Sequence, residues 1–393
     1  MRQIFSSVAA LVLVLGPMTV APQVAHAAPP VIVVGTQSAA CPDAQFSKIQ
    51  DAVDHASPGT VIRICPGTYP EQVSIKIALS LQGENGAVIE PSHLGVNTMG
   101  TFSGAPLAPI ILVKDTTDVD IEGVIVDGAN NDITACGPDF IGILYQNASG
   151  EVKRVAVRNI KLSTNLNGCQ SGSAILVQSG SAGMSVVDVE DSSIHDYQKN
   201  GITGNEIGTK VRIENNVVTG VGPTTGAAQN GIQIGFGADG SISRNTVANH
   251  IWSPCVSLES CENIATDILV FESDGVSVEQ NVAGFSQTGI DIVANRARVA
   301  QNQVFDTLTF DGIKLAGNDN AATDNSITHS DRAGVFIDGN NNNVRRNRIN
   351  EAAFGVLKVA GSTGNIIFFN NFSNATVIVQ DPAGQGSKAS PYR

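Results

Sequence analysis

Four side chains that could perform acid–base chemistry lie within or at the start of a short repeated motif. The motif is Gly-Ile-x-Ile or a close relative, and x is Asp291 in one copy and Lys314 in the next. Asp311 begins the strand that carries Lys314, and Asp267 begins an earlier strand of the same kind. Carboxylates one or two such strands apart would lie about 5 to 10 Å from each other, a range that covers both arrangements of paired acids in glycoside hydrolysis.

The same residues allow two other interpretations. A lysine beside carboxylates could be the base of a β-elimination on a uronic acid, with Ca²⁺ held by aspartates to neutralise the substrate carboxylate. Asp291 and Lys314 could also form no more than a surface salt bridge. The sequence leaves these interpretations open, and it assigns no metal site.

Longer segments near these strands carry polar and aromatic residues that could bind a sugar. Trp252 is the single tryptophan of the chain, and it could stack on a sugar ring or pack within its own segment. The residues expected to bind substrate are Gln233, which occupies x in its copy of the motif, and Trp252, His250, Tyr197 and Gln229.

Two repeated units alternate along the chain and predict its fold. One is Asn-x-(Val/Ile), as in Asn302-Gln303-Val304, and the other is Gly-Ile-x-Ile, as in Gly289-Ile290-Asp291-Ile292. Their period of about 22 residues suits one turn of a β-helix and is too short for a propeller blade. We therefore expect an all-β chain that forms a single-stranded right-handed parallel β-helix of about 11 coils.

Stacking of the coils would align equivalent side chains in columns. The asparagines would form a ladder in which each buried amide bonds to the next. The outward residues of the Gly-Ile-x-Ile strands would form a second column, here called the floor column: Leu144, Leu176, Thr203, Gln233, Leu269, Asp291, Lys314, Phe336 and Leu357. The longer coils carry inserts at 128–141, 163–173, 219–230 and 249–266, which we expect to wall a groove above this column.

Both ends of the chain are expected to lie outside the regular coils. Residues 1–27 have the charged start, the apolar run and the Ala-x-Ala site of a signal peptide. The spacing of apolar residues predicts a helix over 44–56 that caps the first coil. The β-helix domain would span 28–381, and residues 382–393, rich in Pro, Gly and Ser, would form a flexible tail.

Charge and cysteine content narrow the class of protein. A formal net charge of −13 argues against a nucleic-acid partner, which would need clustered Lys and Arg. No stretch is long and apolar enough for a membrane span. The six cysteines fit an oxidising compartment, extracellular or periplasmic. Nearness in sequence favours Cys41–Cys65, Cys136–Cys169 and Cys255–Cys261, although other pairings are open.

The N-terminal part of the sequence resembles the start of pectin-lyase-like β-helix proteins. The resemblance lies in the segments Phe46 to Val53 and Val61 to Glu71, and the later coils are similar to the parallel β-helix repeats of that superfamily. The resemblance covers about residues 41–380. It implies the fold and a substrate held on the sheet beside the longer loops. The catalytic signatures of pectinesterases, polygalacturonases and pectate lyases are not matched, so no catalytic residue is carried over from them.

These observations predict a secreted carbohydrate-active protein whose partner is a polysaccharide. The expected activity is cleavage of an acidic polysaccharide by a lyase or a glycoside hydrolase, with Asp291, Lys314, Asp311 and Asp267 as catalytic residues. Ca²⁺ is the cofactor that such chemistry could require. The alternatives are a non-catalytic glycan-binding or surface β-helix protein and a periplasmic accessory protein of a metal or export system, although the lack of Met or His clusters argues against copper handling. The sequence does not indicate the oligomeric state.

Overall fold

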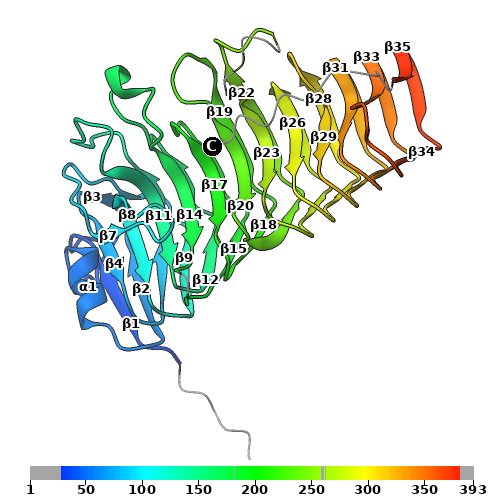
Figure 1. The fold of residues 1–393 in the computed structure, drawn as a ribbon. Helices are drawn as coiled ribbons and strands as arrows, with labels where there is room; N and C mark the ends of the chain where they lie inside the picture. Colours follow the sequence, from blue (N-terminus) through cyan, green and yellow to red (C-terminus); the bar gives the residue numbers. More distant parts are fainter. Residues whose placement is uncertain (1–27, 181, 258–260, 262, 381–393) are drawn as a thin grey trace, which may run out of the picture.

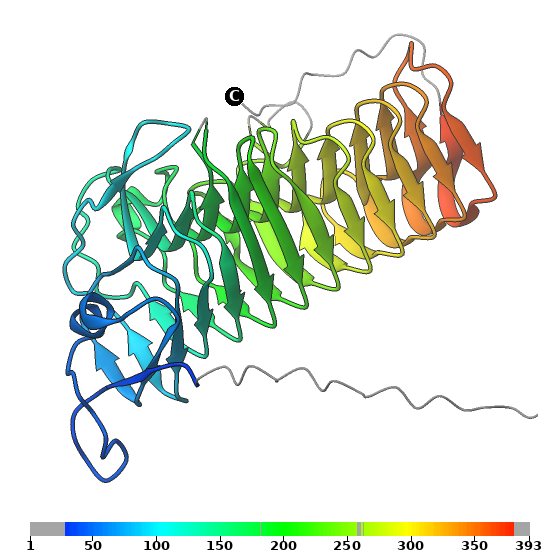
Figure 2. The same cartoon turned by 90° about the horizontal axis from the view of Figure 1, so that it is seen from below.

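The computed structural model describes residues 28–180, 182–257, 261 and 263–380. Within them the chain forms a right-handed parallel β-helix, an elongated stack of coils with a short helix at its N-terminal end (Figures 1 and 2). The signal peptide expected at 1–27 and the tail expected at 382–393 lie outside the described residues.

Three ladders of parallel strands make up the coils. The first ladder stacks 13 strands: β1 (Val31–Val34), β2 (Thr60–Ile64), β5 (Leu79–Gly83), β9 (Val119–Glu122), β12 (Gly150–Lys153), β15 (Ser185–Glu190), β18 (Thr209–Glu214), β21 (Asp239–Ser243), β24 (Ser277–Glu279), β27 (Arg298–Ala300), β30 (Ala321–Thr323), β32 (Asn343–Arg345) and β34 (Ile366–Phe368).

The second ladder carries the Asn-x-(Val/Ile) strands. It consists of β3 (Gly67–Tyr69), β6 (Ala87–Ile89), β10 (Ile125–Asp127), β13 (Ala156–Arg158), β16 (Ser193–His195), β19 (Val217–Thr224), β22 (Thr246–Trp252), β25 (Val282–Ser286) and β28 (Gln303–Thr307).

The third ladder carries the Gly-Ile-x-Ile strands. It consists of β4 (Val73–Ile75), β8 (Pro106–Lys114), β11 (Asp139–Gln146), β14 (Ser173–Gln178), β17 (Asn200–Asn205), β20 (Asn230–Gly235), β23 (Thr266–Phe271), β26 (Thr288–Val293) and β29 (Ile313–Ala316), with β7 (Thr98–Met99) antiparallel to β8. Three long strands extend both the second and third ladders: β31 (Ser326–Asp338), β33 (Arg348–Lys358) and β35 (Asn371–Gln380).

One apolar core runs along the inside of the solenoid. Because side chains alternate across a strand, the two isoleucines of each Gly-Ile-x-Ile unit point inward and the residue between them points outward. Ile290 and Ile292, which flank Asp291, are both fully buried in this core. The same cluster extends from Val34 in the first coil to Val356 near the last.

The N-terminal end is closed by a helix shorter than the one expected at 44–56. Helix α1 spans Ile49–His55 and buries Ile49, Ala52 and Val53 against the first coils. Its free backbone N–H groups are bound by the Glu71 carboxylate, at 2.8 Å from Ile49 N and 2.9 Å from Gln50 N. A negative charge at a helix N-terminus is stabilising, so a residue of the next coil fixes the cap in place.

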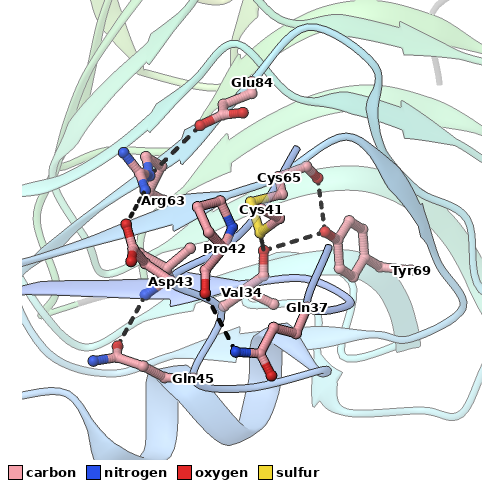
Figure 3. Close-up of a disulfide and its surroundings, with 11 residues drawn as sticks. Val34, Gln37, Cys41, Pro42, Asp43, Gln45, Arg63, Cys65, Tyr69 and Glu84 are labelled. Carbon is pink, nitrogen blue, oxygen red and sulfur yellow. Dashed lines mark hydrogen bonds and ion pairs between the residues drawn. A yellow bond between two sulfur atoms is a disulfide. The ribbon is translucent and has the colours of Figure 1, made fainter. Parts of the chain in front are cut away.

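Two strands precede the first coil that the sequence repeats reveal. The first ladder therefore has 13 strands, whereas about 11 coils were expected. The two strands are β1 and β2, and the Cys41–Cys65 disulfide ties the loop after β1 to the end of β2 (Figure 3). The Tyr69 hydroxyl lies beside this disulfide and donates to the Cys65 carbonyl oxygen at 2.7 Å (Figure 3).

The predicted asparagine ladder is present. The side-chain oxygen of each member accepts both the backbone N–H and the side-chain N–H of the member one coil earlier, at 2.9 to 3.0 Å. Its members are Asn216, Asn245, Asn281, Asn302, Asn325, Asn347 and Asn370. A buried amide that would be costly alone is therefore fully bonded within the column.

All four expected inserts connect the second ladder to the third, on one side of the stack (Figure 1). The Cys136–Cys169 disulfide links the first two inserts, and Cys255–Cys261 closes a small ring within the fourth. The three disulfides are the pairs that nearness in sequence favoured, and they fit an extracellular or periplasmic protein. Among the described residues, no helix has the length and apolar content that a membrane crossing requires.

Candidate functional site

The floor column forms as expected on the outer face of the third ladder. The register aligns Leu176 with Thr203, Thr203 with Gln233, and Gln233 with Leu269. It continues through Asp291, Lys314, Phe336 and Leu357, each one coil further. Strands β14 to β29 lie side by side in Figure 1, so these residues form a single strip.

Asp291 and Lys314 form an ion pair on neighbouring coils of this strip. Lys314 Nζ lies 3.1 Å from Asp291 Oδ2. The Asp291 side chain is fully buried and Lys314 is 12% exposed, so this is not the solvated salt bridge that the sequence allowed. Asp291 Oδ1 has no hydrogen-bond partner in the described part of the chain.

Burial governs the protonation of Asp291. Loss of hydration raises the pKa of this carboxyl, and the nearby Asp311 charge raises it further. Lys314 and Arg332 act in the opposite direction but do not outweigh burial. Asp291 therefore keeps a proton to higher pH than an exposed aspartate does.

Asp311 pairs with an arginine that the sequence did not single out. Arg332, in β31, donates through Nε to Asp311 Oδ1 at 2.8 Å and through Nη2 to Oδ2. Its guanidinium carbon lies 4.3 Å from the centroid of the Phe336 ring. Phe336 follows Lys314 in the floor column. A bidentate contact and a stacked ring hold the guanidinium in one orientation, so Asp311 faces a fixed positive charge.

Asp267 lies inside the solenoid and not on the strip. It occupies the position that Gly231 and Gly289 hold in the neighbouring coils, where a Cβ points inward. At Gly231 such a Cβ would be 2.3 Å from a Val247 methyl in the core. The Asp267 carboxylate occupies that interior space, so the expected placement beside Asp291 in a groove does not hold.

His250 and Tyr197 are the partners of Asp267 within the core. His250 Nδ1 lies 2.6 Å from Asp267 Oδ1, and His250 Nε2 bonds to the Tyr197 hydroxyl. All three side chains are fully buried. Burial lowers the pKa of His250 to about 3 and raises that of Asp267 well above its ordinary value, with the Ser286 hydroxyl and the Gly284 amide opposing the second shift.

This buried chain of three residues differs from the sequence expectation, which put Tyr197 and His250 on the wall of a groove. Tyr197 belongs to the apolar core inside the solenoid, and the His250 ring lies behind Gly231 on the same inner side, so neither side chain points to the outer strip. Their contacts instead connect three segments: Asp267 lies in β23, His250 lies near the end of β22, and Tyr197 lies just before β17.

Gln229 belongs to a set of buried glutamines that fasten the inserts. Its side chain donates to the Tyr197 carbonyl oxygen at 2.6 Å and accepts from Val221 N at 3.0 Å. Gln198 bonds in the same way to the insert that contains Cys169, and Gln287 to the insert that contains Trp252. The contacts of Gln229 are therefore structural, and the side chain is 1% exposed.

Trp252 lies on the fourth insert and is partly exposed. Its indole N–H donates to the Gly226 carbonyl oxygen of the third insert at 2.9 Å, and its backbone N–H to Gln287. The ring therefore braces two inserts while part of its surface stays accessible. Lys199, on the same side, donates to the Ala228 carbonyl oxygen at 2.7 Å, and burial lowers its pKa to about 8.

Gln233 is the expected binding residue with the richest polar surroundings. Asn200 and Asn230 both donate to its side-chain oxygen, at 3.4 and 3.2 Å, and its own amide donates to Asn205 at 3.1 Å. The two donors occupy equivalent positions in β17 and β20, one column to the side of the floor column. Their repetition at the start of these strands is the signal that could have identified them.

The residues described here do not include a preformed metal centre. No group of three or more His, Cys, Asp or Glu side chains in them is arranged to hold a metal ion.

Comparisons with known proteins agree on the class of protein. The fold and the stacked strip define a right-handed parallel β-helix protein. A family model described as periplasmic copper-binding protein (NosD) matches residues 255–388, about a third of the chain. A search of curated proteins found no match.

Solved structures with the same fold include proteins of several activities. They include the GH136 lacto-N-biosidase from Eubacterium ramulus (TM-score 0.60, 10% identity, 89% of this chain and 68% of that one). The Dettilon tailspike protein gp208 has a TM-score of 0.57 at 12% identity, over 83% of this chain and 64% of that one, so this chain spans less than two thirds of it. The A-module of the mannuronan C-5 epimerase AlgE4 from Azotobacter vinelandii has a TM-score of 0.53 at 13% identity, over 86% and 95%. At these identities the similarity shows the fold alone.

Proposed function

We propose that this protein is a secreted carbohydrate-active enzyme that cleaves a polysaccharide lying along the floor column, with Asp291 as the general acid. The observation that carries the proposal is the state of Asp291: a buried carboxyl on the outer strip, with a raised pKa and one oxygen without a partner. A carboxylic acid that keeps its proton to higher pH than an exposed aspartate can protonate the leaving oxygen of a glycosidic bond.

Asp311 is the second carboxylate that glycoside hydrolysis requires. It lies on the coil after Asp291, three residues before the Lys314 that aligns with Asp291. Both carboxylates are fully buried, but both oxygens of Asp311 are bonded by Arg332, whereas Asp291 keeps one oxygen without a partner and has a raised pKa. This difference lets the two carboxylates divide the roles of acid and of base or nucleophile. Asp267, inside the core, takes no direct part in this scheme.

Hydrolysis accounts for the geometry better than elimination does. A lysine that serves as the base of a lyase must give up its proton, but Lys314 already donates to Asp291. The two cations of the cluster, Lys314 and Arg332, are each paired with an aspartate. An acidic polysaccharide would therefore have to compete with these aspartates or bring Ca²⁺ with it.

The second candidate is a non-catalytic glycan-binding protein. The ion pairs Lys314–Asp291 and Arg332–Asp311 favour this candidate as well. A rigid binding surface also requires that each buried charge has a partner of opposite sign. The fold relatives named above include a lacto-N-biosidase and a C-5 epimerase, so the fold does not choose between the candidates.

The first prediction tests Asp291 directly. Asp291→Asn keeps the shape of the side chain and removes the acid, so we expect cleavage to fall by about 10²- to 10⁴-fold while glycan binding is retained. The assay measures new reducing ends and unsaturated products from a panel of neutral and uronic polysaccharides, with and without Ca²⁺. Asp274→Asn, on an exposed ion pair, is the control. Retained binding with no turnover in the unmodified protein would favour the non-catalytic candidate.

A further inference from the structure

A cluster of buried amides lies on the strip upstream of Asp291 and is not used by the proposed acid–base chemistry. Gln233 is its centre, bonded to Asn200, Asn230 and Asn205. Thr203 precedes Gln233 in the floor column, and Gln178 aligns with Asn205 one coil earlier. Leu269 is the single member of the column between Gln233 and Asp291, so the cluster is about 10 Å from the carboxyl.

Four polar atoms of this cluster lack hydrogen-bond partners in the described part of the chain. They are Asn200 Oδ1, Asn230 Oδ1, Thr203 Oγ1 and Gln178 Nε2. Each belongs to a side chain that is less than 10% exposed: 8% for Asn200, 3% for Asn230, 1% for Thr203 and 4% for Gln178. Buried polar atoms in native proteins nearly always have a partner, so these four should be bonded to water or to a bound molecule.

The donors and acceptors already used in hydrogen bonds determine which polar atoms of the cluster remain free for a ligand. Both asparagines use an amide N–H to bond Gln233 Oε1, and Gln233 uses its own N–H to bond Asn205. Two carbonyl oxygens on adjacent coils are therefore left as acceptors, beside a hydroxyl and one amide donor. Acceptors of this kind pair with hydroxyl groups, whereas a carboxylate placed against them would meet oxygen with oxygen.

We propose that the amide cluster is the subsite for an uncharged, hydroxyl-bearing sugar unit next to the cleavage point, which makes the substrate a neutral or mixed glycan and not a polymer of uronic acids. This inference rests on the proposed function, because it takes the strip as the path of the glycan. It replaces the acidic polysaccharide that the sequence suggested with a neutral or mixed one, because the cluster contains no cation to balance a carboxylate.

Binding to the inactive full-length variant Asp291→Asn tests the subsite. The probes are neutral gluco-, manno-, galacto- and N-acetylglucosamine oligosaccharides, with oligogalacturonate and oligomannuronate as charged counterparts, measured by calorimetry. We expect at least one neutral series to bind and the uronates to bind at least tenfold more weakly. Asn230→Leu and the near-isosteric Thr203→Val should each weaken the neutral ligand about tenfold or more. Asn350→Leu, on a distant coil, is the control and should leave binding unchanged.

The outcomes separate the subsite from the proposed function. Preferred binding of uronates would overturn the neutral subsite while leaving a polysaccharide function intact. Neutral binding that is unchanged in folded Thr203→Val and Asn230→Leu, with folding checked by thermal unfolding, would show that the cluster holds ordered water only. If no oligosaccharide of either kind binds or is cleaved, the proposed function and the subsite fail together.

Discussion

At the residue scale, Asp291 combines an outward position with almost complete removal from solvent. The sequence located it correctly because the x position of Gly-Ile-x-Ile must point away from the core. The sequence could not show its burial, nor the contact between Arg332 and Asp311. Arg332 lies within the 13-residue strand β31, between its Asn-x-Ile and Gly-Val-x-Ile units, where neither motif says which way a side chain points.

The pH dependence of cleavage follows from the raised pKa of Asp291. A general acid works only while it is protonated, so kcat/KM should fall as the pH rises through this raised value, which lies above the ordinary 3.8. In a pH–rate profile we expect the descending limb to be absent from the residual activity of Asp291→Asn. A descending limb that persists unchanged in that variant would assign it to another group.

The raised pKa of Asp291 also determines how its contribution to the free energy of unfolding changes with pH. Folded Asp291 binds its proton more tightly than the unfolded chain does, so its contribution favours the folded state below pH 3.8 and is lost as the pH rises through the folded pKa. The buried carboxyl therefore costs stability at neutral pH, as is common for groups retained for function.

The contacts of Asp267 predict a contrast between two substitutions. Burial raises its pKa, so the neutral amide in Asp267→Asn is a close substitute, and we expect a loss of less than about 1 kcal/mol in the free energy of unfolding. Asp267→Leu leaves His250 Nδ1 without a partner and should cost about 3 kcal/mol. Chemical denaturation measures both, with Asp274→Leu on the surface as the control. Equal losses for the two variants would contradict this account.

The error over Asp267 has a physical cause that the sequence contained. Strand alternation alone does not say which way a residue points at the corner where a strand begins. Equivalent corners carry Gly231 and Gly289, because the space behind them is filled by core side chains such as Val247. A polar residue at a position otherwise held by glycine indicates an interior partner, here His250.

At the element scale, the asparagine ladder supplies a comparison between inner and terminal rungs. Asn302→Ala removes the acceptor for Asn281 N and Nδ2 and the donor to the Val278 carbonyl oxygen, all buried. We expect a loss of about 3 kcal/mol. Asn370→Ala removes the equivalent contacts with Asn347 and with the Val344 carbonyl oxygen, but at a half-buried position where water can replace them, so it should cost about 1 kcal/mol. Thermal unfolding measures both; a larger loss at Asn370 would contradict the ladder as the source of stability.

The repeated elements could be predicted because the same two sequence motifs recur in successive coils. The strands, the columns and the side on which the inserts lie all follow from the alternation of two motifs. A second amide ladder, formed by Asn320, Asn342 and Asn365, went unrecognised because it has fewer members and no flanking motif. The glutamine contacts were missed for a similar reason: Gln198, Gln229 and Gln287 precede strands of differing sequence.

At the scale of the whole molecule, the solenoid should tolerate loss of one complete coil. Deleting residues 303–325 removes β28, β29 and β30 together and lets Asn302 take the place of Asn325 in the ladder. Because coils interact with their nearest neighbours, we expect a cooperative β-rich protein with a Tm lowered by roughly 5 °C. Cleavage should be lost, since Asp311 and Lys314 are removed.

A deletion of half a coil is the matched control. Removing residues 303–314 leaves the three ladders out of register, so the variant should not fold, as judged by circular dichroism. Unfolding of the full-coil deletion under the same conditions would contradict the independence of the coils.

The asparagine ladder also gives the chain a means of rejecting misaligned states. A slip of one residue in any coil moves its asparagine out of reach of the carbonyl and amide groups above and below. The penalty falls where the shifted coil meets an unshifted neighbour, because several buried hydrogen bonds are lost there at once. Inserts can lengthen at the opposite corner without this penalty, because the count restarts at the next asparagine. The polar column thus acts as a checkpoint for alignment that leaves the loops free to diverge in evolution.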